Sequence, residues 1–234
     1  MKTLEDNSDS LCNIIQGKLW KEKIAPKFLD KVVLPLILYF DDYETNNELG
    51  SHTGVHKLGA TYYRIACLPP QFQSSLENVF LVNLFHSTDK VFGNANIFRK
   101  VLNELKYLED TGITVVTENE IIKVYFAMCL FTGDNLGANS TLGYVESFSA
   151  NYYCRICKEH KKVVQKQTIS NPLMRRNVIN YNADLTINNG TETGIKSECI
   201  FNELRSFHVV ENIHVDIMHD LDEGVWKETM TCIV

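Results

Sequence analysis

Residues 32–42 read VVLPLILYFDD, a run of branched and aromatic side chains that ends in two aspartates. Apolar and polar side chains do not alternate along this run, which is typical of a strand covered on both faces at the centre of a sheet. We therefore predict a central strand over Val32–Asp41. Aspartate is common where a strand meets a turn, so Asp41 and Asp42 on their own are equally consistent with a structural role.

Further elements are predicted on both sides of this strand. Apolar residues recur with helical spacing between Ile97 and Leu108 and predict a helix there. Periodicity leaves both helix and strand open for the apolar run 121–131, IIKVYFAMCLF. The other predicted segments are a helix at 11–23, strands at 61–67, 79–85 and 113–116, a hairpin at 50–56, an irregular insertion at 167–200 and helical structure over 201–234.

The composition excludes several classes of protein. The chain has 234 residues, of which 44% are hydrophobic and 22% charged, so we expect a folded globular protein. Its net charge of −6 argues against a protein that coats nucleic acid by itself, because the overall negative field repels phosphate groups. We also expect no membrane span, because no apolar run is long enough, and no secretory leader, because the first ten residues are polar and acidic. The seven cysteines are therefore expected to be reduced.

A second acid follows another apolar run. Asp134 lies in a Gly-Asp-Asn turn directly after residues 121–131. The stretch between Asp41 and Asp134 is long enough for two more strands and one crossover helix, which is the layout of an RNase H-like fold. We expect the two acids to end neighbouring central strands and to face Mg²⁺ or Mn²⁺, which prefer oxygen ligands. Two such ions about 4 Å apart promote phosphodiester chemistry.

Cys154 and Cys157 form a C-x2-C pair, which is the spacing of half a tetrahedral zinc site. His214 and His219 could supply the other half, and His160 and His208 are alternatives. The pair could also be two reduced thiols at a turn, or a redox pair.

The segment from Asp216 to Gly224, DIMHDLDEG, is rich in acids. On a helix, Asp216, His219, Asp220 and Glu223 would share one face. Such a face could bind a metal, although an acidic solvated helix explains the pattern as well.

Shifts in amino-acid composition along the chain predict four segments. They are an N-terminal helical extension (1–30), the first part of an α/β core whose mixed sheet is flanked by helices (31–145), an insertion that carries the cysteine pair (146–207) and a final helical segment (208–234).

Seven short motifs occur in an order that resembles the animal transposase-like proteins related to CACTA (En/Spm) elements, from about residue 30 to about residue 227. They are LPLILYFDDYE (34–44), LGSH (49–52), VFGN (91–94), GDNLG (133–137), SFSANYYCRIC (147–157), FHVVEN (207–212) and DIMHDL (216–221). The resemblance implies an RNase H-like DDE nuclease and strand transferase with Mg²⁺ or Mn²⁺. It also implies DNA as partner, a nuclear location and possible homo-oligomers.

When the roles of the family's residues are transferred to the matching motifs of this chain, two acids receive catalytic roles. Asp41 matches the first catalytic Asp, with Asp42 as its alternative, and Asp134 matches the second. Cys154 and Cys157 match the C-x2-C half of a structural zinc site.

The resemblance also matches Asp216 and His219 to a D-x2-H signature between the second Asp and the catalytic Glu, where we count both as candidate metal ligands. In the family, the zinc-binding His pair and the catalytic Glu lie further downstream, in a part that this chain does not contain. Glu223 and His214 are the alternative candidates for these roles. We therefore expect a C-terminally incomplete fragment with little or no nuclease activity alone. A domesticated, non-catalytic nuclear or DNA-associated scaffold is the alternative function.

Overall fold

The structure, a computed structural model, describes residues 13–45, 57–73, 75–212, 214–226 and 230. The chain divides into two compact units, which we treat separately. Unit 1 comprises Met1–Phe131 and Ile200–His208, and unit 2 comprises Thr132–Cys199 and Val209–Val234. The hairpin predicted at 50–56 and the first two residues of the helix predicted at 11–23 lie outside the described residues.

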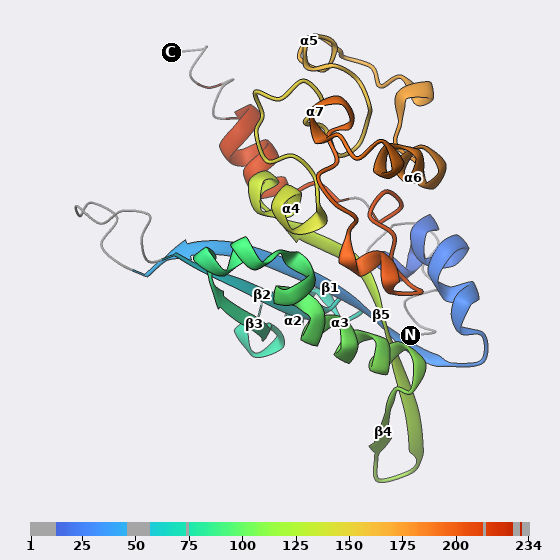
Figure 1. The fold of residues 1–234 in the computed structure, drawn as a ribbon. Coiled ribbons are helices and arrows are strands. Elements are labelled where there is room, and N and C mark those ends of the chain that lie inside the picture. Colours follow the sequence, from blue (N-terminus) through green and yellow to red (C-terminus); the bar gives the residue numbers. More distant parts are fainter. Residues whose placement is uncertain (1–12, 46–56, 74, 213, 227–229, 231–234) are drawn as a thin grey trace. The chain divides into compact units, whose positions relative to one another are not determined.

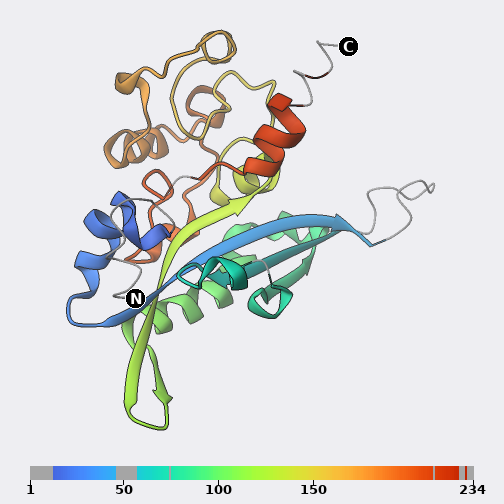
Figure 2. The ribbon, with the colours of Figure 1, turned by 180° about the vertical axis from the view of Figure 1, so that it is seen from behind.

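Unit 1 is built on a five-stranded sheet with the order β3-β2-β1-β5-β4 (Figure 1). The pairs β1/β2, β2/β3 and β4/β5 are antiparallel, whereas Figure 2 shows β1 and β5 running in the same direction. The predicted α/β class with a mixed sheet is therefore confirmed, and the ambiguous run 121–131 is a strand. The strands are β1 (Val32–Glu44), β2 (Lys57–Ile65), β3 (Phe80–His86), β4 (Ile113–Val116) and β5 (Ile121–Gly133).

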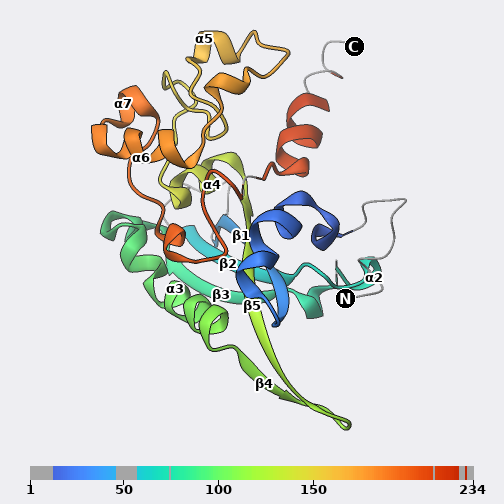
Figure 3. The same cartoon turned by 90° about the vertical axis from the view of Figure 1, so that its right-hand side faces the viewer.

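The central strand β1 is covered on both faces, as its unbroken apolar pattern predicted. Successive side chains of a strand point to opposite faces. Phe40 packs edge-on against Phe98 of helix α3 (Asn94–Asp110), with ring centroids 6.4 Å apart. Val33, on the other face, joins a buried cluster with Trp20 and Phe28 of the N-terminal turns. Figure 3 shows these turns, in blue, and α3, in green, on opposite sides of the sheet. Shorter elements of unit 1 are Ile14–Gln16, Leu19–Ile24, Ala25–Phe28, α2 (Pro70–Gln73), Leu76–Asn78 and Ser87–Phe92.

The segment 200–208 returns to unit 1 and docks on α3. Phe201 is fully buried, and its ring lies 5.6 Å from those of Phe98 and Phe131. The prediction of helical structure from residue 201 is wrong for residues 201–208, where the short turn Ile200–Glu203 is the one helical element. The backbone N–H groups that a helix would use are taken by a side chain, because the buried Glu109 carboxylate accepts from the amides of Arg205 and Ser206.

Apart from the end of β5, the regular elements of unit 2 are helices, and they correct the irregular insertion predicted at 167–200. Helix α6 (Val178–Ile187) forms there, because Asn177 and Asn180 cap its start reciprocally at 2.9 Å and Asn188 ends it with φ of 50°. The asparagines that suggested a loop are thus helix caps. The other elements are α4 (Asn135–Leu142), α5 (Lys161–Val164), Pro172–Met174, α7 (Gly190–Thr193) and the final helix Met218–Trp226.

Within the described ranges, every helix is too short or too polar to cross a membrane.

Candidate functional site

Asp41 and Asp42 lie near the end of β1 in unit 1, and they face opposite sides of the sheet. Asp42 lies on the side of Phe40 and α3, where its carboxylate accepts a hydrogen bond from Ser87 Oγ at 3.0 Å and forms an ion pair with Lys90. Asp42 is therefore held by two side chains of the turn Ser87–Phe92.

Asp41 lies on the other face of the sheet, in a setting rich in tyrosine. Its register partner on β2 is Ala60, and the preceding pair on the same face is Tyr39 with Tyr62. Burial raises the pKa of the Tyr62 phenol, and the nearby Tyr43 and Asp41 raise it further. The half-buried Asp41 carboxylate is thus close enough to Tyr62 to influence its ionisation.

Asp134 directly follows β5 and opens helix α4 in unit 2. Its Oδ1 atom caps the helix by accepting the backbone N–H of Gly137. The capping bond uses one carboxylate oxygen, so Oδ2 is the atom that could bind a cation. A helix N-terminus stabilises this negative charge.

The start of α4 is connected to the acidic segment at 216–220. Asn135 Nδ2 donates to the Asp220 carboxylate, whose Oδ2 also accepts the backbone N–H of Asp216 at 3.0 Å. Asp216 in turn caps Met218 at 3.0 Å through Oδ1 and binds His219 Nδ1 at 3.0 Å through Oδ2. Unit 2 therefore gathers Asp134, Asp216 and His219, three of the predicted site residues, around one end of α4.

The ionisation of His219 reflects these acids. Burial lowers the pKa of His219, but the hydrogen bond to Asp216 and the charges of Asp216, Asp134 and Glu223 outweigh it and leave the pKa above its usual value. Glu223 is exposed on the final helix. The predicted common face of Asp216, His219, Asp220 and Glu223 is altered, because Asp216 precedes the helix and caps it.

The Cys154–Cys157 turn has the hydrogen bonds expected of a metal-binding knuckle. Cys154 Sγ accepts the backbone N–H groups of Ile156 and Cys157, each at 3.4 Å. Burial raises the pKa of the Cys157 thiol, and the adjacent Cys154 sulfur raises it further. Both thiols are free. A raised pKa disfavours the thiolate, which a redox-active cysteine and a zinc ligand both need.

A buried arginine that the sequence did not single out anchors this turn. Arg176, fully buried, donates to the backbone oxygens of Cys154 at 3.1 Å and Thr193 at 2.7 Å, and it pairs with Asp184 at 3.2 Å. Lys158 adds a second ion pair to Asp184 at 2.7 Å. No sequence signal marks Arg176, since its partners come from three separate segments.

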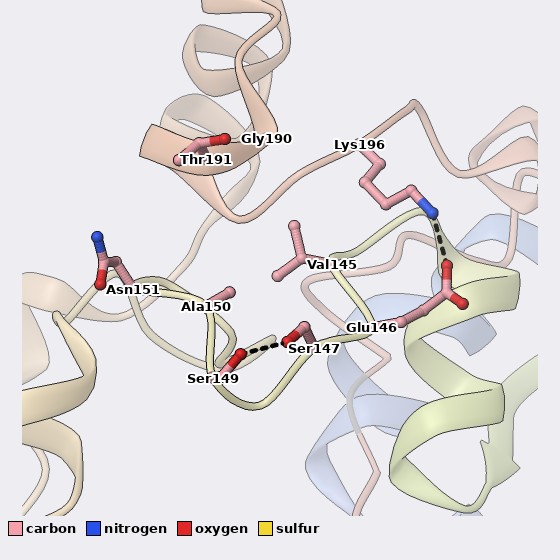
Figure 4. A pocket seen from close by; sticks show the side chains of 9 residues that line it. All are labelled: Val145, Glu146, Ser147, Ser149, Ala150, Asn151, Gly190, Thr191 and Lys196. Carbon is pink, nitrogen blue, oxygen red and sulfur yellow. Dashed lines mark hydrogen bonds and ion pairs between the residues drawn. The ribbon is translucent and has the colours of Figure 1, made fainter.

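Unit 2 also has an open pocket of about 500 Å³ (Figure 4). Its wall carries hydroxyl groups from Ser147 and Ser149, which are 2.7 Å apart, and the Lys196–Glu146 ion pair at 2.6 Å. None of the predicted site residues lines this pocket.

Neither predicted metal site is complete in the part of the chain that the structure describes. Within those residues, no three or more His, Cys, Asp or Glu side chains are arranged to hold a metal ion. Cys154 and Cys157 supply two donors suited to zinc, and His219 is engaged with Asp216. Asp41 belongs to unit 1, whereas Asp134 belongs to unit 2.

Comparison with known proteins gives no family for this chain. No model of a known protein family matches it, and no curated protein is significantly similar to it.

Proposed function

We propose that this chain is part of a transposase-derived catalytic core of the RNase H-like DDE class, which does not cleave DNA on its own. In the complete protein the core would cut and join DNA in the nucleus with Mg²⁺ or Mn²⁺. One observation carries the proposal. The strand that bears Asp41, β1, is the hydrogen-bonded neighbour of β5, the strand that ends directly before Asp134.

The elements between the two acids also support the proposal. Strands β2 and β3 and helix α3 separate them, as the RNase H-like layout requires, and the short β4 is added at the sheet edge. Asp41 is the residue that the resemblance matches to the first metal ligand, and Asp42, which is held by Ser87 and Lys90, is the alternative.

The proposed lack of activity follows from the number of carboxylates. Two acids can bind one cation loosely, but a second cation needs a further fixed ligand before the reacting oxygens are aligned. Glu223, the alternative candidate for the third carboxylate, is exposed on the final helix. Among the predicted catalytic acids, Asp134 is the other one that belongs to unit 2. We therefore propose that another carboxylate, outside this chain, completes the site.

A structural role for zinc is part of the same proposal. Cys154 and Cys157 would supply two thiolate ligands, oriented by the amides that donate to Cys154 Sγ. Bound zinc would hold the turn in shape. The remaining two ligands would be the histidine pair that the resemblance implies further downstream, with His214 as the weaker alternative.

Cation binding tests the proposal directly. We would titrate the chain with Mn²⁺ and follow free Mn²⁺ by electron paramagnetic resonance, comparing the wild type with Asp41→Asn, Asp134→Asn and the control Asp42→Asn. We expect the first two variants to bind Mn²⁺ about tenfold more weakly, because each loses a charged oxygen ligand. Asp42→Asn should bind like the wild type.

The outcomes separate the functions under consideration. Equal Mn²⁺ affinity in all four proteins would reject the catalytic ancestry and leave the non-catalytic scaffold. A plasmid-nicking assay with Mn²⁺ tests the second part of the proposal. Nicking by the wild type that is lost in Asp134→Ala would show that the chain is active alone.

A further inference from the structure

The turn between the two cysteines carries an arginine with contacts of its own. Arg155 Nη1 donates to Asn135 Oδ1 at 2.6 Å and to Asn139 Oδ1 at 3.4 Å, while Nη2 donates to the backbone oxygen of His214 at 3.3 Å. One half-buried guanidinium therefore joins the cysteine turn, helix α4 and the segment that leads to Asp216.

The contact with Asn135 acts on the residue next to Asp134. Asn135 is the first residue of α4, and Asp134 is its cap. The Asn135 amide is held at both ends, since Oδ1 accepts from Arg155 and Nδ2 donates to Asp220. Fixing this side chain fixes the first turn of α4, and with it the direction of the Asp134 carboxylate.

Arginine suits this position better than lysine. Its planar guanidinium reaches acceptors on two segments at once with a preset geometry, whereas the lysine ammonium is a point charge on a flexible stem. The contacts to Asn135 and to His214 use different nitrogens of the same plane. A lysine here would keep the positive charge but could not donate to both segments with two fixed nitrogens.

We propose that Arg155 is a positioning residue, which orients the Asp134 carboxylate for cation binding through Asn135. The inference rests on the proposed function, because it assumes that Asp134 binds a divalent cation. It also gives the C-x2-C turn a second role, in that the turn sets where the guanidinium lies.

Charge and geometry have opposite effects here, and this decides the choice of variant. Removing the positive charge of Arg155 would favour a cation at Asp134. Removing the two-pronged hydrogen bonding of the guanidinium would leave the Asp134 carboxylate less firmly oriented. Arg155→Ala mixes the two effects. Arg155→Lys keeps the charge and changes only the geometry, so it isolates positioning.

The test is the same Mn²⁺ titration, applied to Arg155→Lys, Asn135→Ala and the double variant. Residues that hold a metal ligand in place typically contribute 10–100-fold to affinity, so we expect each single variant to weaken Mn²⁺ binding about tenfold. Because Arg155 acts through Asn135, the double variant should be no weaker than Asn135→Ala alone. The control Lys158→Ala removes a positive charge near the same turn, where it contacts Asp184, and should leave Mn²⁺ affinity unchanged.

Each outcome has a defined meaning. Wild-type affinity in Arg155→Lys, with weakened binding in Asp134→Asn, would overturn the role of Arg155 and leave the proposed function intact. Unchanged affinity in Asp134→Asn would overturn both. Circular dichroism of every variant identifies any that is unfolded. If Arg155→Lys does not fold, wild-type affinity in Asn135→Ala would overturn the inference by itself.

Discussion

The Glu109 carboxylate accepts the backbone N–H of Ser206 at 3.0 Å, so one acid at the end of α3 holds a segment 97 residues further along the chain. Glu109 is buried, and it also accepts from the Arg205 amide at 2.9 Å and from the Ser206 hydroxyl. Three donors therefore compensate for burying the negative charge.

Replacing Glu109 by Ala should destabilise unit 1 by about 3 kcal/mol, because several hydrogen bonds to a charged group are lost and two amides are left unpaired. Urea unfolding would measure this change. The matched control is Asp110→Ala, whose side chain is 68% exposed and contacts Arg205 only at 3.5 Å. It should cost less than about 1 kcal/mol. Equal losses in the two variants would contradict a role for Glu109 in docking the segment.

The Arg176–Asp184 pair should dominate the stability of unit 2. Asp184→Ala leaves the guanidinium of Arg176 buried without its counter-charge, and we expect a loss of about 3–5 kcal/mol in thermal or denaturant unfolding. Glu146→Ala breaks the exposed pair with Lys196 and should cost less than about 1 kcal/mol. A small effect of Asp184→Ala would mean that solvent reaches Arg176.

Two glycines with similar φ angles should respond differently to alanine. Gly194 has φ of 77°, and an added Cβ would lie 2.0 Å from the backbone oxygen of Tyr152. Gly93 has φ of 80° but nothing within 4 Å of the added atom. Gly93→Ala should therefore cost only the backbone strain of its conformation (φ 80°, ψ 153°), which few residues other than glycine adopt, about 1–3 kcal/mol. Gly194→Ala should cost clearly more, since backbone must move. Similar melting temperatures for both variants would contradict this reasoning.

The His219–Asp216 pair should make stability depend on pH. The folded pKa of His219 lies above its ordinary value of 6.5, because burial is outweighed by Asp216 and the neighbouring acids. The stabilising contribution of the protonated ring is thus fully present below about pH 6.5 and is lost as the pH rises through the folded pKa.

Melting temperatures measured between about pH 5.5 and about pH 8.5 would test this dependence. The advantage of the wild type over His219→Gln should be largest at the acidic end and shrink towards the alkaline end. Asp216→Asn should weaken the same dependence, since it removes the negative charge beside the ring while Asp134 and Glu223 remain. An advantage that grows with pH would show that His219 is neutral when it binds Asp216.

The α/β class and the central strand were predictable because their signals are local. Residues 32–41 carry enough branched and aromatic side chains to specify a strand, and the periodic residues of α3 include the buried Val101, Leu102 and Leu105. The helix α6 was missed because asparagine favours both loops and helix caps, and only the reciprocal bonds of Asn177 and Asn180 distinguish the two.

The sequence allowed the acids of the candidate site to be predicted, but it did not reveal the residues that hold those acids in place. Asp134, Asp216 and His219 stood out because they follow apolar runs or form a short motif. Arg155 and Arg176 act through partners from distant segments, and a single sequence contains no signal for such contacts. The nearest available hint was position itself, since Arg155 lies between the two cysteines and Asn135 follows Asp134.

The amide of Asn135 illustrates how narrowly one position can be specified. A guanidinium only donates and an ionised carboxylate only accepts, so an amide placed between Arg155 and Asp220 satisfies both in just one of its two orientations. Aspartate would lose the donor and repel Asp220, serine would be too short to span the gap, and an aliphatic residue would offer neither atom. Saturation mutagenesis should therefore find position 135 less tolerant than its exposed neighbour Leu136.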